Sequence, residues 1–267
     1  MRKLVYIFSL IILLTSCEKE ILDEVKNKSG GDVTIKFSPS DYFSRLNVSI
    51  FDSIGNKVAS DAQRSTDKNY SLIELDLPNG KYRIAAILHN TEKSVSISDV
   101  NKVVFSGSLG DIYSYCDSLE INDGSSTYNI ETQRSVGMFR IILENDNIPS
   151  DVNTYTITYT GSKSLNLITG CGATKAKQTD TKNVASGTDT LNYYLLPGAN
   201  DLKYKITLTA YANNTEIATY TFEDVIIRTN EITAYRGKLF NNEKNFIQVT
   251  YGFKADATWK DITYHDF

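Results

Sequence analysis

Apolar and polar residues alternate in many short segments of this chain. Between Leu46 and Ile50, the apolar side chains are separated by Asn47 and Ser49. Such alternation puts apolar side chains on one face of a β-strand and polar ones on the other. Similar patterns predict strands at residues 33–37, 46–52, 57–59, 72–77, 82–88, 138–143, 154–160, 202–211, 216–222, 224–227, 232–240 and 247–253. The predicted fold is therefore all-β, with two tandem antiparallel β-sandwich domains.

Two similar corners punctuate this pattern. Leu77-Pro78-Asn79-Gly80 precedes one predicted strand, and Leu196-Pro197-Gly198 follows another. Glycine adopts a positive φ readily, and tight hairpins demand one, so we predict positive φ at Gly80 and Gly198. The loosest polar stretch is residues 123–126. We place the domain boundary just after it, near residues 125–135, between an N-terminal sandwich at 32–130 and a C-terminal sandwich at 131–267.

The first residues have the pattern of an export signal. Arg2 and Lys3 precede an apolar run, and Leu14-Thr15-Ser16 leads to Cys17. A positive start, a short apolar core and small residues predict a signal peptide at residues 1–16. Leu14-Thr15-Ser16-Cys17 resembles a bacterial lipobox, in which Cys17 is lipidated and becomes the new N-terminus. An ordinary signal peptide with an incidental cysteine is the alternative.

A lipidated Cys17 predicts attachment to the cell outer membrane. Several acyl chains hold a protein on a membrane almost permanently. The charged residues 17–31, which end in Ser29-Gly30-Gly31, suit a short solvated tether, and we expect the protein to be exposed at the cell surface.

Charge and composition exclude other classes of partner. The formal net charge is −4, and loss of residues 1–16, which hold two basic residues and no acidic one, makes it −6. A mildly acidic chain without basic clusters argues against nucleic acid as a partner. The 17 tyrosines favour strands over helices.

Three pieces of the chain carry a family resemblance. They are residues 46–55 with 77–82, residues 134–140 with 148–152, and residues 228–240, in which an Asn and a Thr precede Arg236-Gly237. In this order they resemble the fimbrillin-like lipoproteins of Bacteroidales, which are subunits of type V pili, and especially the anchor subunits that stay lipidated at the pilus base. The resemblance implies a transthyretin-like first sandwich and a structural role.

The resemblance also implies other fimbrial subunits as partners. Subunits of that family join when one chain donates a strand to the next. Shaft subunits lose an N-terminal segment to a protease that cuts after arginine, and Arg45 is a conceivable site. Cleavage there would release the lipid anchor, and Val33–Phe37 has the pattern of an integral first strand. We therefore expect an anchor or accessory subunit.

The end of the chain divides into two parts. Residues 247–253 alternate like a strand that completes the second sandwich. Residues 264–267 have a looser pattern and are predicted to be available to a partner.

Catalytic and metal-binding patterns are not found in the sequence. His89 and His265 are isolated, no zinc-ligand spacing or phosphate loop occurs, and Glu144–Asn147 lacks the oxygen set that calcium needs. Arg236 and Trp259 could line a ligand surface. We predict no enzymatic activity and no cofactor.

Two further predictions concern covalent bonds. Cys116 and Cys171 fall in different predicted domains, so we expect them to be unpaired. Three tripeptides that begin with aspartate resemble the O-glycosylation site of Bacteroidetes, with Ser53, Ser118 and Thr190 as the possible acceptors.

A lipid-anchored glycan-binding module of a carbohydrate-uptake system is the alternative function. Such modules are also β-sandwiches, and they bind sugar through exposed aromatic platforms. A row of exposed Tyr or Trp on one face would favour this alternative, whereas an open strand groove would favour assembly.

Overall fold

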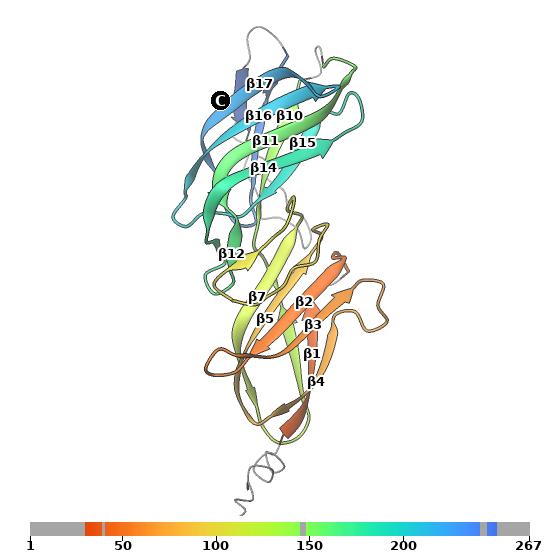
Figure 1. Cartoon of the computed structure of the whole chain (residues 1–267), viewed down its shortest axis with the longest axis vertical. Coiled ribbons are helices and arrows are strands. Elements are labelled where there is room, and N and C mark those ends of the chain that lie inside the picture. Colours follow the sequence, from red (N-terminus) through yellow and green to blue (C-terminus); the bar gives the residue numbers. More distant parts are fainter. Residues whose placement is uncertain (1–29, 39–40, 145–147, 241–244, 250–267) are drawn as a thin grey trace, which may run out of the picture.

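The computed structural model describes residues 30–38, 41–144, 148–240 and 245–249. They form two β-sandwiches that follow each other along the long axis of the molecule (Figure 1). The secondary structure in these ranges consists of strands and turns, which confirms the all-β, two-sandwich fold. None of the described segments is a helix long and apolar enough to cross a membrane.

The first sandwich packs a sheet of five strands, in the order β3-β2-β5-β7-β9, against a sheet of three, in the order β4-β1-β8. Val33, Ile35 and Phe37 of β1 are buried in the core between them, as their alternation predicts. Full burial of one such side chain contributes ~1.5–3 kcal/mol. The strands are β1 (Gly30–Ser38), β2 (Arg45–Phe51), β3 (Lys57–Arg64), β4 (Leu72–Pro78), β5 (Gly80–His89), β7 (Ile112–Ile121), β8 (Ser126–Glu131) and β9 (Gln133–Arg134).

The second sandwich has two sheets of four strands, in the orders β14-β11-β16-β17 and β15-β10-β18-β19. Its core includes Phe139, Tyr155 and Ile206, each at most 1% exposed. The strands are β10 (Gly137–Leu143), β11 (Val152–Ser162), β14 (Lys175–Asn183), β15 (Thr190–Leu195), β16 (Lys203–Ala212), β17 (Thr215–Ile226), β18 (Ile232–Lys238) and β19 (Asn245–Val249).

The two sandwiches repeat one topology. In each, the first strand lies between two neighbours of the same kind: β1 is antiparallel to β4 and parallel to β8, and β10 is antiparallel to β15 and parallel to β18. The orders β3-β2-β5-β7 and β14-β11-β16-β17 also correspond. The parallel pairs were not predicted from sequence. The strand β19, which pairs with β18, has no described counterpart in the first sandwich.

An apolar cluster joins the two sandwiches. Ala85 and Ile87, on the outer face of the five-stranded sheet, belong to the same buried cluster as Leu165, Leu167 and Leu196 of the second sandwich. A small sheet reinforces this junction, because β6 of the first half pairs with β12 of the second. The strands of this sheet are β6 (Val103–Val104), β12 (Ser164–Asn166) and β13 (Cys171–Gly172).

A buried arginine also bridges the junction. The Arg134 guanidinium donates hydrogen bonds of 2.8 Å to both carboxylate oxygens of Asp111, and one of 2.6 Å to the Asn230 side chain. It also lies 4.9 Å from the centre of the Tyr113 ring. The side chains of Arg134 and Asp111 are 1% and 7% exposed. Burial of an ion pair costs solvation free energy, which hydrogen bonds within the protein have to offset. The bonds from Arg134 to Asp111 and Asn230 do so.

The two glycine corners differ from the prediction. Neither Gly80 nor Gly198 has a positive φ. Both corners carry the chain from one sheet of a sandwich to the other, so neither closes a tight hairpin. A Cβ added at Gly80 would lie 3.6 Å from the Tyr82 ring, an ordinary contact, whereas at Gly198 it would lie 2.5 Å from the Leu202 Cβ. Only the second position requires glycine, and it does so for space.

A buried histidine holds the end of β5. His89 is 0% exposed. Its Nε2 lies 2.9 Å from the Asn47 Oδ1, and its Nδ1 lies 2.6 Å from the Thr91 Oγ1. Burial, and after it the charge of Arg45, lower the pKa of His89 to about 4. The network ties β2 and β5 to the segment that begins at Thr91 and covers the outer face of the sheet.

We predict that the Arg134→Ala substitution destabilises the fold, because it leaves the Asp111 carboxylate buried and unpaired. The expected loss of unfolding free energy is ~3–5 kcal/mol, measured by urea unfolding. The double variant Arg134→Met/Asp111→Leu removes both charges and should recover a large part of that loss.

Arg228→Ala is the matched control. The Arg228–Asp201 pair has the same 2.8 Å hydrogen bonds, but its side chains are 49% and 54% exposed. Loss of this pair should cost much less unfolding free energy than loss of the buried pair, because solvent screens an exposed ion pair. Equal losses for the two arginine variants would contradict a special role for the buried pair.

We also predict a pH dependence of stability that comes from His89. Unfolded histidine binds a proton near pH 6.5, whereas folded His89 does so only near pH 4. Its contribution is therefore fully present above about pH 6.5 and decreases as the pH falls toward 4, by up to about 3 kcal/mol. Urea midpoints measured across this range should vary less in His89→Gln than in the unsubstituted protein. His265→Gln, which changes the other of the two histidines, should keep the full dependence.

Candidate functional site

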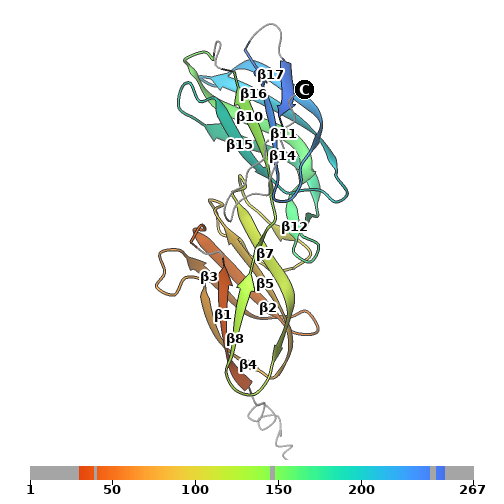
Figure 2. The same cartoon turned by 180° about the vertical axis from the view of Figure 1, so that it is seen from behind.

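The strand β8 has an open outer edge. In the second sandwich, β18 pairs with β10 on one side and with β19 on the other. In the first, β8 holds the position of β18, but among the described strands it pairs with β1 alone (Figure 2). A strand edge exposes N–H and C=O groups that a further strand can bind.

The side chains of β8 alternate between the core and solvent. Ile130 is 5% exposed, and Thr127 and Asn129 are exposed. Tyr128 is half-buried, and its hydroxyl donates a 2.6 Å hydrogen bond to the carbonyl of Glu120 on β7. β8 is thus held firmly on the sandwich. The backbone groups at its edge can bind the backbone of an added strand, and its alternating side chains can contact the side chains of that strand.

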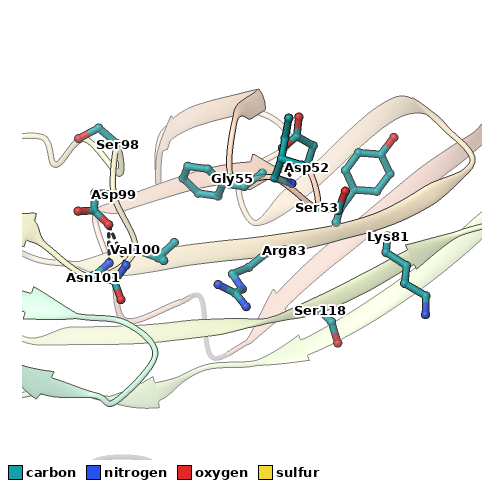
Figure 3. A pocket seen from close by; sticks show the side chains of 13 residues that line it. Asp52, Ser53, Gly55, Lys81, Arg83, Ser98, Asp99, Val100, Asn101 and Ser118 are labelled. Carbon is teal, nitrogen blue, oxygen red and sulfur yellow. Dashed lines mark hydrogen bonds between the residues drawn. The ribbon is translucent and has the colours of Figure 1, made fainter.

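A second feature is a hollow of about 500 Å³ in the first sandwich, which we call the β5 hollow. Lys81 and Arg83 of β5 line it together with Ser118 of β7, the register partner of Arg83. The β2–β3 turn, which begins at Asp52, lines one side, and the segment Ser98–Asn101 lines another. Figure 3 shows Arg83 between this segment and Ser118.

The two carboxylates of the hollow are held by turns. Asp52 Oδ1 accepts hydrogen bonds of 3.0 and 2.8 Å from the backbone N–H groups of Ile54 and Asn56. Burial raises the pKa of Asp52, but the bonds from Asn56, Ile54 and Gly55 together outweigh it, so the net shift is downward. Asp99 Oδ1 accepts a 2.8 Å bond from the N–H of Asn101. Within the described ranges, neither Lys81 nor Arg83 forms an ion pair with a protein carboxylate.

The predicted acceptors of O-glycosylation are all exposed. Ser53 lies in the β2–β3 turn and Ser118 on β7, and both line the β5 hollow. Thr190 begins β15 in the second sandwich, where its hydroxyl donates a 3.0 Å bond to Asp189. The structure therefore brings two of the three together, and modification of any of them stays a prediction. Cys17 lies outside the described residues.

The remaining sequence candidates are dispersed. His89 is buried in the network described above. Cys116 and Cys171 are free thiols, which confirms that they are unpaired, and they line a second hollow of about 440 Å³ between the sandwiches. Burial raises the pKa of the Cys116 thiol. No three metal-binding side chains gather anywhere in the described part of the chain.

Other predicted surface residues give no site. Glu144 is exposed, and the rest of Glu144–Asn147 lies outside the described residues, as do Trp259 and His265. Arg236 is exposed on β18. Tyr42, 62% exposed, is the one exposed large aromatic residue among those described, so these residues carry no aromatic row of the kind that glycan-binding modules use.

The closing strand is partly described. β19 spans Asn245–Val249 and pairs with β18, so this part of the predicted strand does complete the second sandwich. The rest of residues 247–253, and residues 264–267, lie outside the described ranges.

Solved structures share this fold at low sequence identity. A candidate adhesin from Bacteroides thetaiotaomicron is 14% identical with a TM-score of 0.54, and the match covers 83% of this chain and 95% of that one. A candidate adhesin from Bacteroides ovatus is 15% identical with a TM-score of 0.51, covering 79% and 88%. A candidate polysaccharide-binding protein from B. thetaiotaomicron is 11% identical with a TM-score of 0.52, covering 83% and 94%.

A family sequence profile identifies the family of this chain. No curated protein matches the chain by sequence. The profile of the fimbrillin-A associated anchor proteins Mfa1 and Mfa2, however, matches residues 22–260, which include both sandwiches and all three pieces that carry the resemblance noted from sequence. The chain therefore belongs to the family of fimbrillin-A associated anchor proteins.

Proposed function

We propose that this protein is a lipid-anchored subunit at the base of a fimbria, or an accessory subunit there, and that it binds a neighbouring subunit by strand addition at β8. The observation that supports this proposal is a difference between the corresponding sheets β4-β1-β8 and β15-β10-β18-β19. The edge that β19 covers beside β18 is open beside β8. A strand from a neighbour, added there, would take the place in the first sandwich that β19 has in the second.

The position of β1 supports a subunit that keeps its N-terminus. β1 is the central strand of its sheet, paired with β4 through Gly30–Lys36 and with β8 through Val33–Ser38. Arg45 is the first residue of β2, where it pairs with Arg64 of β3 and His89 of β5. Proteases cut exposed, unpaired chain. Cleavage after Arg45 would require β2 to leave both neighbours, so the chain would retain its membrane attachment.

The proposed attachment is a lipid on Cys17. The residues between Cys17 and β1 are mostly charged, which suits a solvated tether between an outer membrane and the first sandwich. β1 begins at the end of the first sandwich that is far from the second sandwich (Figure 1). Residues 264–267 would remain available to a partner.

We predict that Cys17→Ala abolishes lipidation and releases the protein from the outer membrane. Without acyl chains, nothing else in the proposed attachment buries apolar surface in the bilayer. Cell fractionation followed by mass spectrometry of the N-terminal peptide is the measurement. Retention of the variant with the outer membrane after a high-salt wash would contradict the lipid anchor.

We also predict that β8 contacts a neighbouring subunit in assembled fimbriae. Asn129→Cys places a thiol on the exposed face of β8, and an oxidant should cross-link it to cysteines introduced along the donated strand of the neighbour. Asn183→Cys, exposed at the end of β14, is the matched control and should give no such product. Cross-linking from Asn183→Cys but not from Asn129→Cys would place the contact elsewhere.

A further inference from the structure

We propose that the β5 hollow binds a sugar acid, meaning a saccharide unit with one carboxylate among several hydroxyl groups. This binding activity is separate from fimbrial assembly, because the hollow lies on the five-stranded sheet and the open edge of β8 belongs to the other sheet. The volume of about 500 Å³ is in the range of small-molecule sites.

The cations of the hollow supply the recognition of a carboxylate. Lys81 and Arg83 are two positions apart on β5, so both side chains lie on the same face of the sheet. Both are exposed, and neither has a protein carboxylate as its ion-pair partner in the described ranges. A guanidinium binds a carboxylate through two parallel hydrogen bonds, which makes Arg83 the expected contact.

The rest of the lining favours hydroxyl groups over further negative charge. Asp52 and Asp99 would repel phosphate or a polyacidic peptide, but their carboxylate oxygens can accept hydrogen bonds from sugar hydroxyls. Ser98 and Ser118 add hydroxyls that both donate and accept. A saccharide unit that places one carboxylate and several hydroxyls in the hollow, alone or within an oligomer, matches its cations and its carboxylates together, and a simple anion does not.

The aromatic rings of the hollow do not form the open platform that usually holds an uncharged sugar. Phe51 and Tyr82 both line the hollow, but Phe51 is 5% exposed. Tyr82 is half-buried, packs against the core of the first sandwich and donates a 2.8 Å hydrogen bond from its hydroxyl to the carbonyl of Pro78. Charge-assisted hydrogen bonds to Arg83 would have to provide the affinity instead.

The experiment is isothermal titration of the detergent-solubilised mature protein with trigalacturonate, at low salt. Uncharged galactotriose, a triglutamate peptide and inorganic phosphate are titrated in parallel. Trigalacturonate should bind at least about tenfold more tightly than each of the other three, because only it presents a carboxylate together with hydroxyls.

Substitutions locate the binding. Arg83→Gln should weaken trigalacturonate binding by about tenfold or more, and Lys81→Gln should weaken it less. Arg64→Gln, an exposed arginine on β3 outside the hollow, is the matched control and should bind normally. If urea unfolding shows that Arg83→Gln does not fold, the test uses Lys81→Gln and Asp99→Asn instead, and both variants should bind trigalacturonate more weakly than the unsubstituted protein.

Several results would overturn the proposal. They are equal binding of galactotriose, stronger binding of triglutamate or phosphate, and unchanged binding in folded Arg83→Gln. Mass spectrometry of the protein from its native membrane gives a further test. A glycan on Ser53 or Ser118 would fill the hollow and would also overturn it.

Discussion

The buried Arg134 guanidinium fixes the two sandwiches to each other. Arg134 follows β8 along the chain, and its guanidinium binds Asp111, the residue before β7, and Asn230 in the turn before β18. Asn230 has φ +59 and donates its own N–H to the carbonyl of Val136 at 2.9 Å. The charge therefore orders three segments at one point. Because a buried charge tolerates no loss of its partners, the junction has one favoured geometry.

The apolar cluster around this arginine extends the constraint. Leu165, Leu167 and Leu196 pack with Ala85 and Ile87 on the outer face of the five-stranded sheet. A contact between Ser108 and Asp180, at 2.6 Å, adds a polar tie across the same junction. Burial raises the pKa of Asp180, as expected for a carboxyl held between two packed units.

The repeated topology explains how one fold can serve both stability and assembly. Each sandwich has one sheet with a parallel pair, β1–β8 in the first and β10–β18 in the second. Only in the second does a described strand, β19, cover the outer edge of that pair. An open edge is normally a liability because it invites pairing with other chains. In the proposed function, the edge of β8 is used for this pairing. The β5 hollow lies on a different sheet, so ligand binding and assembly would not compete for one surface.

Local alternation by itself predicted strands such as Val33–Phe37, because the two-residue period of a strand follows directly from which side chains are buried. It also predicted the strand from Leu46, although both faces are buried there, since Asn47 and Ser49 hydrogen-bond to the segment that covers the outer face of the sheet. No strand was predicted at β7, β8, β14 or β15. In β14, Lys175–Asn183, the reason is plain, because it is a mainly polar edge strand whose one buried side chain is Asp180. Only the tertiary structure decided which strands lie side by side, and hence the parallel pairs, the unpaired β8 and the ordinary φ of Gly80. The same holds for the β5 hollow, whose residues come from segments far apart in the chain. Alternation reports the buried face of a strand, whereas its neighbours depend on contacts between distant residues.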